Sequence, residues 1–474
     1  MLVADRQAPY AFLLGGMKLF NRRLHEIERM VNGNGLEESN KEIQVEGVSI
    51  DTRTVTSGNL FIPIIGETFN GHEFVETAFA NGAIAALWQQ DQPNPPKDVP
   101  LIYVEDSLVA LQNLAKEYRN SLQIKVVGIT GSNGKTTTKD MVASVLGTTY
   151  KVHKTEGNLN NHIGLPLTIL RLEEDTQVAV LEMGMSGKGE IELLSEIARP
   201  DAALITNIGE SHLLDLGSRE GIAEAKLEII SGLAKDGVLI YHGDEPLLTE
   251  RVKNNGMQTI SFGSSQHCDY YPTSVKQESE GTSFTIANAE STTFYISVLG
   301  KHNVNNALAT IALAEYFNVS LANIAIGLSN LVITNMRTEL ITGKNGVQII
   351  NDAYNASPTS VKAAIELVQD LKGYANKVVV LGDMLELGDN EIHYHLEIGR
   401  YLDPEHIDYV FTYGTLGESI AVGARENFNN DKVFAFTDKA ELIDRLVEKI
   451  NLNDIVLVKG SRGMKLEEVV AALK

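Results

Sequence analysis

A glycine-rich loop between an apolar run and a helical pattern constrains this chain more than any other feature. The segment "VVGITGSNGKTTTKDMVASVL" spans residues 126–146. Small residues let backbone N–H groups approach phosphate oxygens, and a following helix directs the positive end of its dipole at them. The segment therefore predicts a strand, a phosphate-binding loop and a helix, as in an α/β fold.

The loop is a variant of the phosphate-binding pattern G-x-x-x-x-G-K-S/T. The strict spacing requires glycine where this chain has Ile129, whereas Gly134, Lys135 and Thr136 match the pattern. Lys135 supplies positive charge to phosphates, and the Thr136 hydroxyl can ligate Mg²⁺. We interpret the loop as a nucleoside triphosphate site rather than a plain glycine turn, but the loop alone does not identify the reaction.

Length and composition limit the possible classes of protein. A chain of 474 residues predicts two to three domains. The formal net charge of −22 argues against nucleic acid as a main partner, although a few local cations suffice for anionic substrates. The single cysteine, Cys268, permits no intrachain disulfide and is interpreted as an ordinary thiol in a reducing cytoplasm. No apolar run approaches the roughly 20 residues that span a bilayer.

Strand-like and helix-like segments alternate along most of the chain. Runs such as "VAVLEM" and "AALIT" are continuously apolar, which is typical of strands buried on both faces of a parallel sheet. The alternation predicts an α/β protein with a smaller N-terminal α/β domain (17–122), a central P-loop-type domain (123–332) and a C-terminal Rossmann-like, doubly wound domain (333–474). No structure is predicted for residues 1–16.

Several polar residues follow the predicted strands of the central domain. Asn158 and Asn161 lie in "EGNLNNHIGLP", which also suits a turn that caps a helix. Glu182 ends a buried strand, where a Mg²⁺ ligand is expected, although a solvated glutamate is an alternative. His212 follows the strand in "AALITNIG", and Lys226 lies on a predicted helix, where a surface lysine would be unremarkable without further context.

Two further segments carry candidate nucleotide contacts. Asn303 and Asn306, beside His302, are three residues apart on an incipient helix and share a face, from which their amides can read an adenine edge or cap a helix. In the third domain the candidates are Arg337, Asp352 at a strand end and Asn355 in the following turn. A surface arginine and an ordinary N-capped helix start are the alternatives there.

These segments, in this order, resemble the Mur ligases, the ATP-dependent enzymes that build the peptide of bacterial cell-wall precursors. The resemblance covers nearly the whole chain and rests on "TGSNGKTTTK", "EGNLNNHIGLP", "LEMGMSGKGEI", "TNIGESHL", "GKHNVNNALA" and "DAYNASP". Within the family, "NDAYNASPTS", "VLGDMLELGD" and "VKGSRGMKLE" resemble the member that adds D-alanyl-D-alanine.

The resemblance implies a specific ligase reaction in peptidoglycan synthesis. ATP would activate UDP-N-acetylmuramoyl-tripeptide as an acyl phosphate, and D-alanyl-D-alanine would attack it to give the UDP-linked pentapeptide, ADP and phosphate. It further implies two Mg²⁺ sites, a cytoplasmic monomer with no membrane span, and closure of the third domain over ATP.

The resemblance also assigns roles to residues. The implied ATP contacts are Gly131, Ser132, Asn133, Gly134, Lys135, Thr136, Thr137, His302, Asn303, Asn306, Arg337, Asp352 and Asn355. The implied metal ligands are Thr136, Glu182, His212 and Lys226, the last as a carbamate. The implied catalytic set is Lys135, Glu182, His212, Lys226 and Arg337.

The first domain resembles the family's uridine-nucleotide region. The implied substrate contacts are Ser49, Thr52, Arg53, Gly71 and His72, together with Asn158 and Asn161. Family members more often carry serine where Thr52 stands and aspartate where Asn70 stands, so no role is assigned to Asn70. A plain β-hairpin with capped turns is the alternative for this stretch, and the resemblance disfavours it.

Three rival functions share part of this pattern. A folylpolyglutamate synthase-like ligase would use the same acyl-phosphate logic, but the uridine-type first domain and "DAYNASP" disfavour it. A nucleotide-dependent switch would need no second metal, so the carboxylate, histidine and lysine candidates disfavour it. A P-loop kinase is the weakest of the three.

Overall fold

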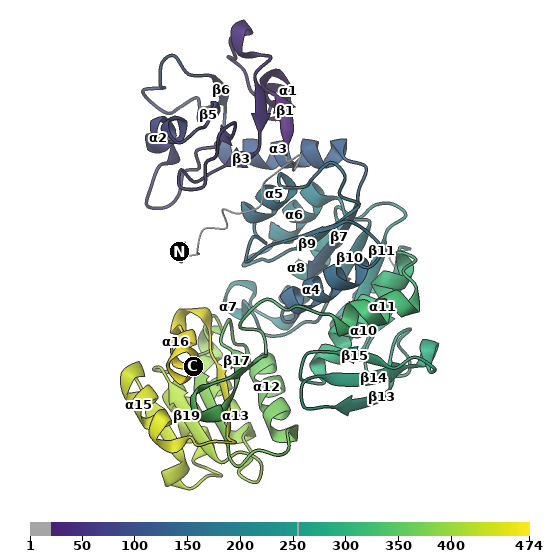
Figure 1. Ribbon diagram of the computed structural model, residues 1–474, viewed down its shortest axis with the longest axis vertical. Coiled ribbons are helices and arrows are strands. Elements are labelled where there is room, and N and C mark those ends of the chain that lie inside the picture. Colours follow the sequence, from purple (N-terminus) through teal and green to yellow (C-terminus); the bar gives the residue numbers. More distant parts are fainter. Residues whose placement is uncertain (1–19, 254–255) are drawn as a thin grey trace. The chain divides into compact units, whose positions relative to one another are not determined.

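The computed structural model describes residues 20–253 and 256–474, which form two compact units (Figure 1). The first unit contains the described residues up to Gln123 together with Pro166–Thr176. The second contains Ile124–Leu165 and the described residues from Gln177 onward. Each unit is described by itself below.

The first unit is built on a four-stranded parallel sheet in the order β3-β4-β5-β6, beside an antiparallel pair of β1 and β2. The strands are β1 (Asn21–Arg23), β2 (Gln44–Glu46), β3 (Val48–Ser49), β4 (Leu60–Phe61), β5 (Ala85–Gln89) and β6 (Leu101–Val104). The α-helices are α1 (Leu24–Met30), α2 (Val75–Ala80) and α3 (Ser107–Ser121). Because β3 and β4 are parallel, the hairpin interpretation of this stretch was wrong.

Helix α3 shows how local sequence sets an element of this unit. Asp106 caps it by accepting a hydrogen bond of 2.8 Å from the backbone N–H of Val109. Its apolar face buries Leu111, Leu114 and Tyr118, and the Tyr118 hydroxyl donates to the Leu172 carbonyl at 2.8 Å. The short segment 166–176 therefore belongs to the first unit.

The second unit contains two six-stranded sheets. The first is wholly parallel, in the order β12-β11-β10-β7-β9-β8. Its strands are β7 (Lys125–Thr130), β8 (Val152–Lys154), β9 (Val178–Glu182), β10 (Ala202–Ile205), β11 (Val238–His242) and β12 (Gln258–Phe262). All residues of β9 and β10 are buried, as their continuously apolar sequences predicted.

Helices pack on this sheet and connect its strands (Figure 1). They are α4 (Lys135–Leu146), α6 (Glu190–Ala198), α7 (Leu213–Leu216), α8 (Arg219–Leu227) and α9 (Pro246–Val252). Helix α5 (Gly164–Ile169) begins in the second unit and continues along the chain into the segment of the first unit that starts at Pro166. Two more, α10 (His302–Tyr316) and α11 (Leu321–Ser329), share one apolar core with α4. This core also takes in a three-stranded antiparallel sheet that sequence reasoning did not anticipate: β13 (Pro272–Gln277), β14 (Thr282–Ile286) and β15 (Phe294–Ile296).

The second six-stranded sheet has the order β16-β17-β21-β18-β19-β20, with β16 antiparallel at one edge. Its strands are β16 (Glu339–Thr342), β17 (Gln348–Asp352), β18 (Lys377–Gly382), β19 (Tyr409–Tyr413), β20 (Val433–Phe436) and β21 (Ile455–Lys459). Its helices are α12 (Pro358–Asp370), α13 (Glu391–Tyr401), α14 (Gly417–Ala424), α15 (Lys439–Lys449) and α16 (Glu467–Leu473). Helices α12, α13 and α14 share one core with the sheet, and α15 and α16 share another. This is the predicted doubly wound fold.

Within the second unit, a buried aspartate joins the phosphate-loop helix to the segment that leads into the second sheet. Asp140 on α4 is fully buried and pairs with Lys154 at 2.6 Å and with Lys139 at 3.4 Å. It also accepts hydrogen bonds from the backbone N–H and the hydroxyl of Thr334, at 2.9 and 2.8 Å. The predicted domain boundary at 332/333 lies beside this anchor and stays a prediction.

None of the helices within the described ranges combines the length and apolarity needed to cross a bilayer.

Candidate functional site

The second unit contains a cavity of about 390 Å³ at the carboxyl ends of strands from both six-stranded sheets. Ligands bind at this edge in open α/β sheets. Its lining includes Ser132, Asn133, Gly134, Lys135, Thr136, Thr137, Asn160, Asn161, Glu182, His212, His302, Asn303, Asn306, Arg337, Thr338, Asp352, Tyr354, Asn355 and Lys459. Residues far apart in the sequence therefore surround one polar space.

The phosphate loop follows β7 and has backbone conformations that require glycine at two positions. Gly131 has φ 148°, and a Cβ there would lie 1.8 Å from the Thr206 hydroxyl oxygen. Gly134 has φ 80°, and a Cβ there would lie 2.8 Å from Asn306 Oδ1 on α10. Both positions combine a left-handed conformation with close approach, so a side chain would displace the loop. The two glycines thus bring the loop against neighbouring elements.

The turn after β10 supports this loop from the side. The backbone N–H of Asn133 donates to Asn207 Oδ1 at 2.9 Å, and the Thr206 hydroxyl donates to the Asn133 carbonyl at 2.6 Å. The Ser132 hydroxyl oxygen accepts from the backbone N–H of Gly209 at 2.8 Å. These bonds hold the loop in shape, and Ser132, Asn133 and Gly134 line the cavity.

Lys135 begins α4 and lines the cavity. Its ammonium group donates to the Gly131 carbonyl at 2.7 Å, within the loop itself. Burial lowers the pKa of Lys135 below its ordinary value; Glu182 opposes that shift, and the positive charge of Arg337 adds to it. An anion in the cavity would reverse these effects by favouring the charged lysine.

Glu182, at the end of β9, offers an oxygen that lacks a partner. Its Oε1 accepts from Asn160 Nδ2 at 2.9 Å, and its backbone N–H donates to the Thr155 hydroxyl at 3.0 Å. Among the described residues its Oε2 has no hydrogen-bond partner, although the side chain is buried. A buried carboxylate oxygen without a partner is costly unless a ligand completes it.

His212 and Lys226 are the other two predicted metal ligands outside the phosphate loop, and they lie in different surroundings. His212 has φ 62°, and its Nδ1 lies 2.9 Å from Glu386 Oε2, but the angle is unsuited to a hydrogen bond. Lys226 on α8 is only 1% exposed. Burial, and secondarily the charge of Lys135, hold the pKa of the Lys226 amine well below its ordinary value. The neutral amine is therefore favoured at this position.

Helix α10 supplies two amides to the lining of the cavity. Asn303 and Asn306 share a face, as predicted, and Asn306 Nδ2 donates to Asn303 Oδ1 at 3.0 Å. Asn303 Nδ2 donates in turn to the Leu299 carbonyl at 2.8 Å. These bonds fix the orientation of both amides beside His302, which also lines the cavity.

Residues beside and within the second sheet contribute positive charge to the cavity. Arg337 Nη2 donates to the Thr136 hydroxyl oxygen at 3.3 Å, and the guanidinium lies 3.9 Å from the centre of the Tyr354 ring. Asp352, at the end of β17, pairs with Lys459, at the end of β21, over 2.5 Å. Lys459 also donates to the Asn355 carbonyl at 3.0 Å.

Comparisons with known proteins agree with this arrangement. Residues 129–314 match the Mur ligase middle domain, residues 336–462 match the Mur ligase glutamate ligase domain, and residues 44–119 match the Mur ligase family catalytic domain. The UDP-N-acetylmuramoyl-tripeptide–D-alanyl-D-alanine ligase of Bacillus subtilis (strain 168) is 55% identical over 455 residues, covering 96% of this chain and 99% of the relative. The chain belongs to the Mur ligase family.

Solved structures support the same assignment. A crystal structure of MurF from Acinetobacter baumannii is similar with a TM-score of 0.87 and 31% identity, covering 96% of this chain and 99% of that one. The structure of MurF ligase from Thermotoga maritima in complex with ADP has a TM-score of 0.80 and 29% identity, covering 90% and 96% of the two chains. The chain is therefore an ATP-dependent ligase of this family.

Most of the predicted nucleotide and metal residues of this Mur ligase line the cavity, but some predicted site residues do not. Lys226 is buried on α8, and Asn158 is not part of the lining, whereas Asn161 is. The Asn161 side chain also accepts from the backbone N–H groups of Ile163 and Gly164, at 3.2 and 2.8 Å. Helix capping, the alternative for this segment, therefore applies to Asn161.

The predicted uridine contacts of the Mur ligase lie in the first unit. The Ser49 hydroxyl donates to the Asp51 carbonyl at 2.9 Å, and Arg53, on the exposed surface, pairs with the Asp51 carboxylate. His72 is buried; its Nδ1 lies 2.8 Å from Asn70 Oδ1, and its Nε2 accepts from the backbone N–H of Gln89 at 3.1 Å. Asn70, to which the sequence assigned no role, therefore positions His72. Thr52 and Gly71 flank these groups in the chain, and the uridine assignments stay predictions.

The cavity residues that sequence reasoning did not assign include Asn160, Tyr354 and Lys459. Asn160 adjoins the predicted Asn161 and supports Glu182. Lys459 ends the apolar strand "IVLVK", which is the same strand-end signal that marked Asp352. Tyr354 has no comparable signal, because its contact with Arg337 depends on the path of the chain between β16 and α12.

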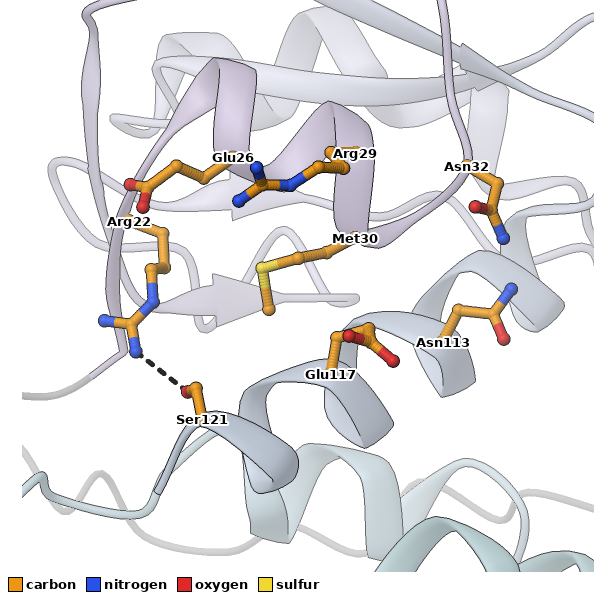
Figure 2. Close-up of a pocket in the computed structure, with 8 residues that line it drawn as sticks. All are labelled: Arg22, Glu26, Arg29, Met30, Asn32, Asn113, Glu117 and Ser121. Atoms are coloured by element: carbon orange, nitrogen blue, oxygen red, sulfur yellow. Dashed lines mark hydrogen bonds between the residues drawn. The ribbon is translucent and has the colours of Figure 1, made fainter. Parts of the chain in front are cut away.

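A second cavity, of about 400 Å³, lies in the first unit between α1 and α3 (Figure 2). It is lined by Arg22, Glu26, Arg29, Met30, Asn32, Asn113, Glu117 and Ser121, none of which is a predicted substrate contact. Arg22 donates to the Ser121 hydroxyl oxygen at 3.0 Å and to Glu174 at 3.1 Å. The positive charge of Arg22 is thus already paired, and we assign no part of the ligase site to this cavity.

Proposed function

We propose that this Mur ligase joins D-alanyl-D-alanine to UDP-N-acetylmuramoyl-tripeptide at the expense of ATP. The products are the UDP-N-acetylmuramoyl-pentapeptide, ADP and phosphate. The observation that carries the reaction type is the cavity in which the phosphate loop, Arg337 and the incompletely partnered Glu182 and His212 face one space. The relatives' names supply the substrate pair.

The residues present fit Mg²⁺, which prefers oxygen ligands and neutralises phosphate charge. Thr136 offers a hydroxyl after the loop lysine, and Glu182 offers a buried oxygen that has no hydrogen-bond partner among residues 20–253 and 256–474. His212 offers a ring that lines the same cavity. We propose that these residues, with Lys226, hold two Mg²⁺ ions, whose contribution is to neutralise charge on the ATP phosphates.

Lys226 fits a carbamate better than an ammonium group. A neutral amine can take up CO₂ and become an anionic, carboxylate-like group, and burial favours the neutral amine here. An unpaired ammonium would be costly in the same environment. The proposed carbamate would add oxygen atoms to the side of the site that already carries Glu182 and His212.

The chain's own groups then lower the barrier between two anions. The substrate carboxylate oxygen forms a bond to the γ-phosphorus of ATP, and the bond between that phosphorus and the ADP oxygen breaks. Lys135 and Arg337, which both line the cavity, supply positive charge to the phosphates as charge develops on the transferring group. The amine of D-alanyl-D-alanine then bonds to the acyl carbon, phosphate leaves with the electron pair, and the amine's proton passes to solvent.

The remaining assignments position the substrates. Asn303 and Asn306, with orientations fixed by hydrogen bonds, are proposed to read the adenine edge, and Asp352 to lie near the ribose. The uridine nucleotide is assigned to the first unit. Closure of the predicted third domain over ATP, a monomeric state and a cytoplasmic location are parts of the same proposal.

The test is phosphate release by the purified chain with ATP, Mg²⁺ and UDP-N-acetylmuramoyl-tripeptide, with and without D-alanyl-D-alanine. We expect release to depend on both substrates and mass spectrometry to find the pentapeptide. D-alanine alone is the matched control and should give no pentapeptide. Release that ignores both substrates, with no new product, would favour the switch; release that depends on a folate and glutamate would favour the folate-type ligase.

A further inference from the structure

A cluster of three potential metal ligands lies outside the ATP cavity, where β11 and β12 end. Asp244 follows β11, whereas His267 and Cys268 lie in the loop after β12. The two strands are parallel neighbours with His242 paired to Phe262, so their following loops meet at one edge of the sheet. The candidate ligand atoms of the three residues all lie within 4.8 Å of one another.

The spacing of these atoms suits one tetrahedral cation. Asp244 Oδ1 lies 3.7 Å from Cys268 Sγ and 3.6 Å from His267 Nε2. Tetrahedral zinc, with bonds of about 2.0 Å to oxygen, 2.1 Å to nitrogen and 2.3 Å to sulfur, separates such ligands by about 3.3–3.5 Å. The Gly243 carbonyl oxygen lies 3.3 Å from His267 Nε2 and is a further ligand within reach.

The surrounding chain holds two of the three ligands in place. Asp244 Oδ2 accepts backbone N–H groups of Ser264 and Ser265, at 2.6 and 3.3 Å, which turns Oδ1 toward the cluster. A Cβ at Gly243 would lie 2.7 Å from Cys268 Sγ, so the absence of a side chain there lets the sulfur approach the strand end. His267 is 64% exposed and is free to complete the set.

We propose that Asp244, His267 and Cys268 form a zinc site that links the ends of β11 and β12. The mixed oxygen, nitrogen and sulfur ligands favour Zn²⁺ over Mg²⁺, which takes oxygen ligands. Burial and the charge of Asp244 raise the pKa of the Cys268 thiol to about 12, so without a cation the sulfur keeps its proton and donates to Asp244. Binding forms a sulfur–zinc bond and releases that proton to solvent.

The test uses the full chain and Co²⁺, a spectroscopic substitute for Zn²⁺. Because the chain has one cysteine, a thiolate-to-cobalt charge-transfer band reports on Cys268 alone, whatever metal the ATP cavity holds. We expect the band to appear with one equivalent of Co²⁺, to disappear on adding Zn²⁺, and to persist with excess Mg²⁺. Zn²⁺ should also protect the thiol from alkylation.

Variants separate a three-ligand site from a lone thiol. His267→Gln changes an exposed side chain, so the fold should survive, and Co²⁺ affinity should fall about tenfold or more. His406→Gln is the control, because His406 forms a similar exposed pair with Asp403, at 2.8 Å, in a loop without cysteine. No thiolate band, or a band that His267→Gln and Asp244→Asn leave unchanged, would overturn the proposal. The result does not depend on the ligase function.

Discussion

The carboxyl edges of the two six-stranded sheets both place buried charged groups at the same cavity, but they treat those groups differently. At the second sheet, Lys459 is 3% exposed and is paired with Asp352. At the first sheet, Glu182 is similarly buried, and its Oε2 lacks a hydrogen-bond partner within the described chain. A protein completes its buried charges itself where it needs a fixed frame, and leaves them incomplete where a ligand supplies the partner.

Among these predictions, replacement of Lys226 should have the largest effect, because it removes the carbamate that we propose completes the Mg²⁺ site beside Glu182. Lys226→Ala removes the proposed carbamate, and we expect the rate of pentapeptide formation to fall by about 10²–10³-fold, as when a preorganised charge is lost from a transition state. The ATP-dependent phosphate-release assay measures it. Lys235→Ala, at an exposed lysine, is the control and should retain full activity.

Rescue of Lys226→Ala by acetate provides a second test of the carbamate. A small carboxylate can enter the space left by the side chain and stand in for the carbamate oxygens, so added acetate should restore part of the rate. The absence of a carbamate carbon signal in the NMR spectrum of the fully active wild-type chain, supplied with ¹³C-bicarbonate, would contradict the carbamate.

Replacement of Lys459 should remove its ion pair with Asp352 at the end of the second sheet and lower mainly the stability of the fold. Lys459→Met leaves Asp352 as a largely buried carboxylate without its partner, and we expect a loss of about 3 kcal/mol in the free energy of unfolding. Chemical denaturation measures it. Adding Asp352→Asn should recover much of the loss, because no charge is then left unpaired. Equal losses in the single and double variants would show that the pair is not what stabilises this edge.

A buried histidine on α13, which packs on the second sheet, should give the smallest effect: a change in stability with pH. His395 is fully buried; its Nε2 accepts from the backbone N–H of Met384 at 2.9 Å, and its Nδ1 lies 2.6 Å from the Glu391 carbonyl. Burial lowers the pKa of His395 below 6.5, although Glu391 and Asp383 oppose this. The folded chain therefore favours the neutral ring.

The sign of the pH effect follows from that lowered pKa. The stabilisation from the neutral ring is complete above pH 6.5, the ordinary histidine value, and is lost as the pH falls from there through the lower pKa of the folded state. Unfolding free energies measured across this range should decline less in His395→Gln than in the wild type. Identical slopes in the two proteins would exclude His395 as the source.

Much of the fold was predictable because its signals are local. The phosphate loop follows its strand and precedes its helix as expected, and Glu182 and Asp352 end strands as their sequences indicated. The sheet β13-β14-β15 was not predicted, since its strands are short and two of them carry few apolar residues. The hairpin interpretation of residues 47–74 failed because parallel pairing depends on distant segments rather than on a turn.

The candidate site was predictable to the extent that its residues form motifs. Arg337 and Asp352 were assigned from family resemblance, and both line the cavity. The pairing of Asp352 with Lys459 spans 107 residues of sequence, and the approach of Tyr354 to Arg337 depends on backbone path. Neither contact can be predicted from the sequence around its residues. Similarly, the lowered pKa of Lys226 follows from three-dimensional burial, whereas its helical pattern alone indicated a surface lysine.

The anchoring of Thr334 by Asp140 has a mechanical consequence. One end of the segment that leads into the second sheet is fastened to the phosphate-loop helix, only three residues before Arg337. Met336 and Thr338, on either side of that arginine, have φ values of 62° and 53°, which are strained for such side chains. The segment is therefore held at Thr334, close to Arg337. If the second sheet rotates, as the proposed closure requires, Arg337 would move relative to a point that is held at Thr334.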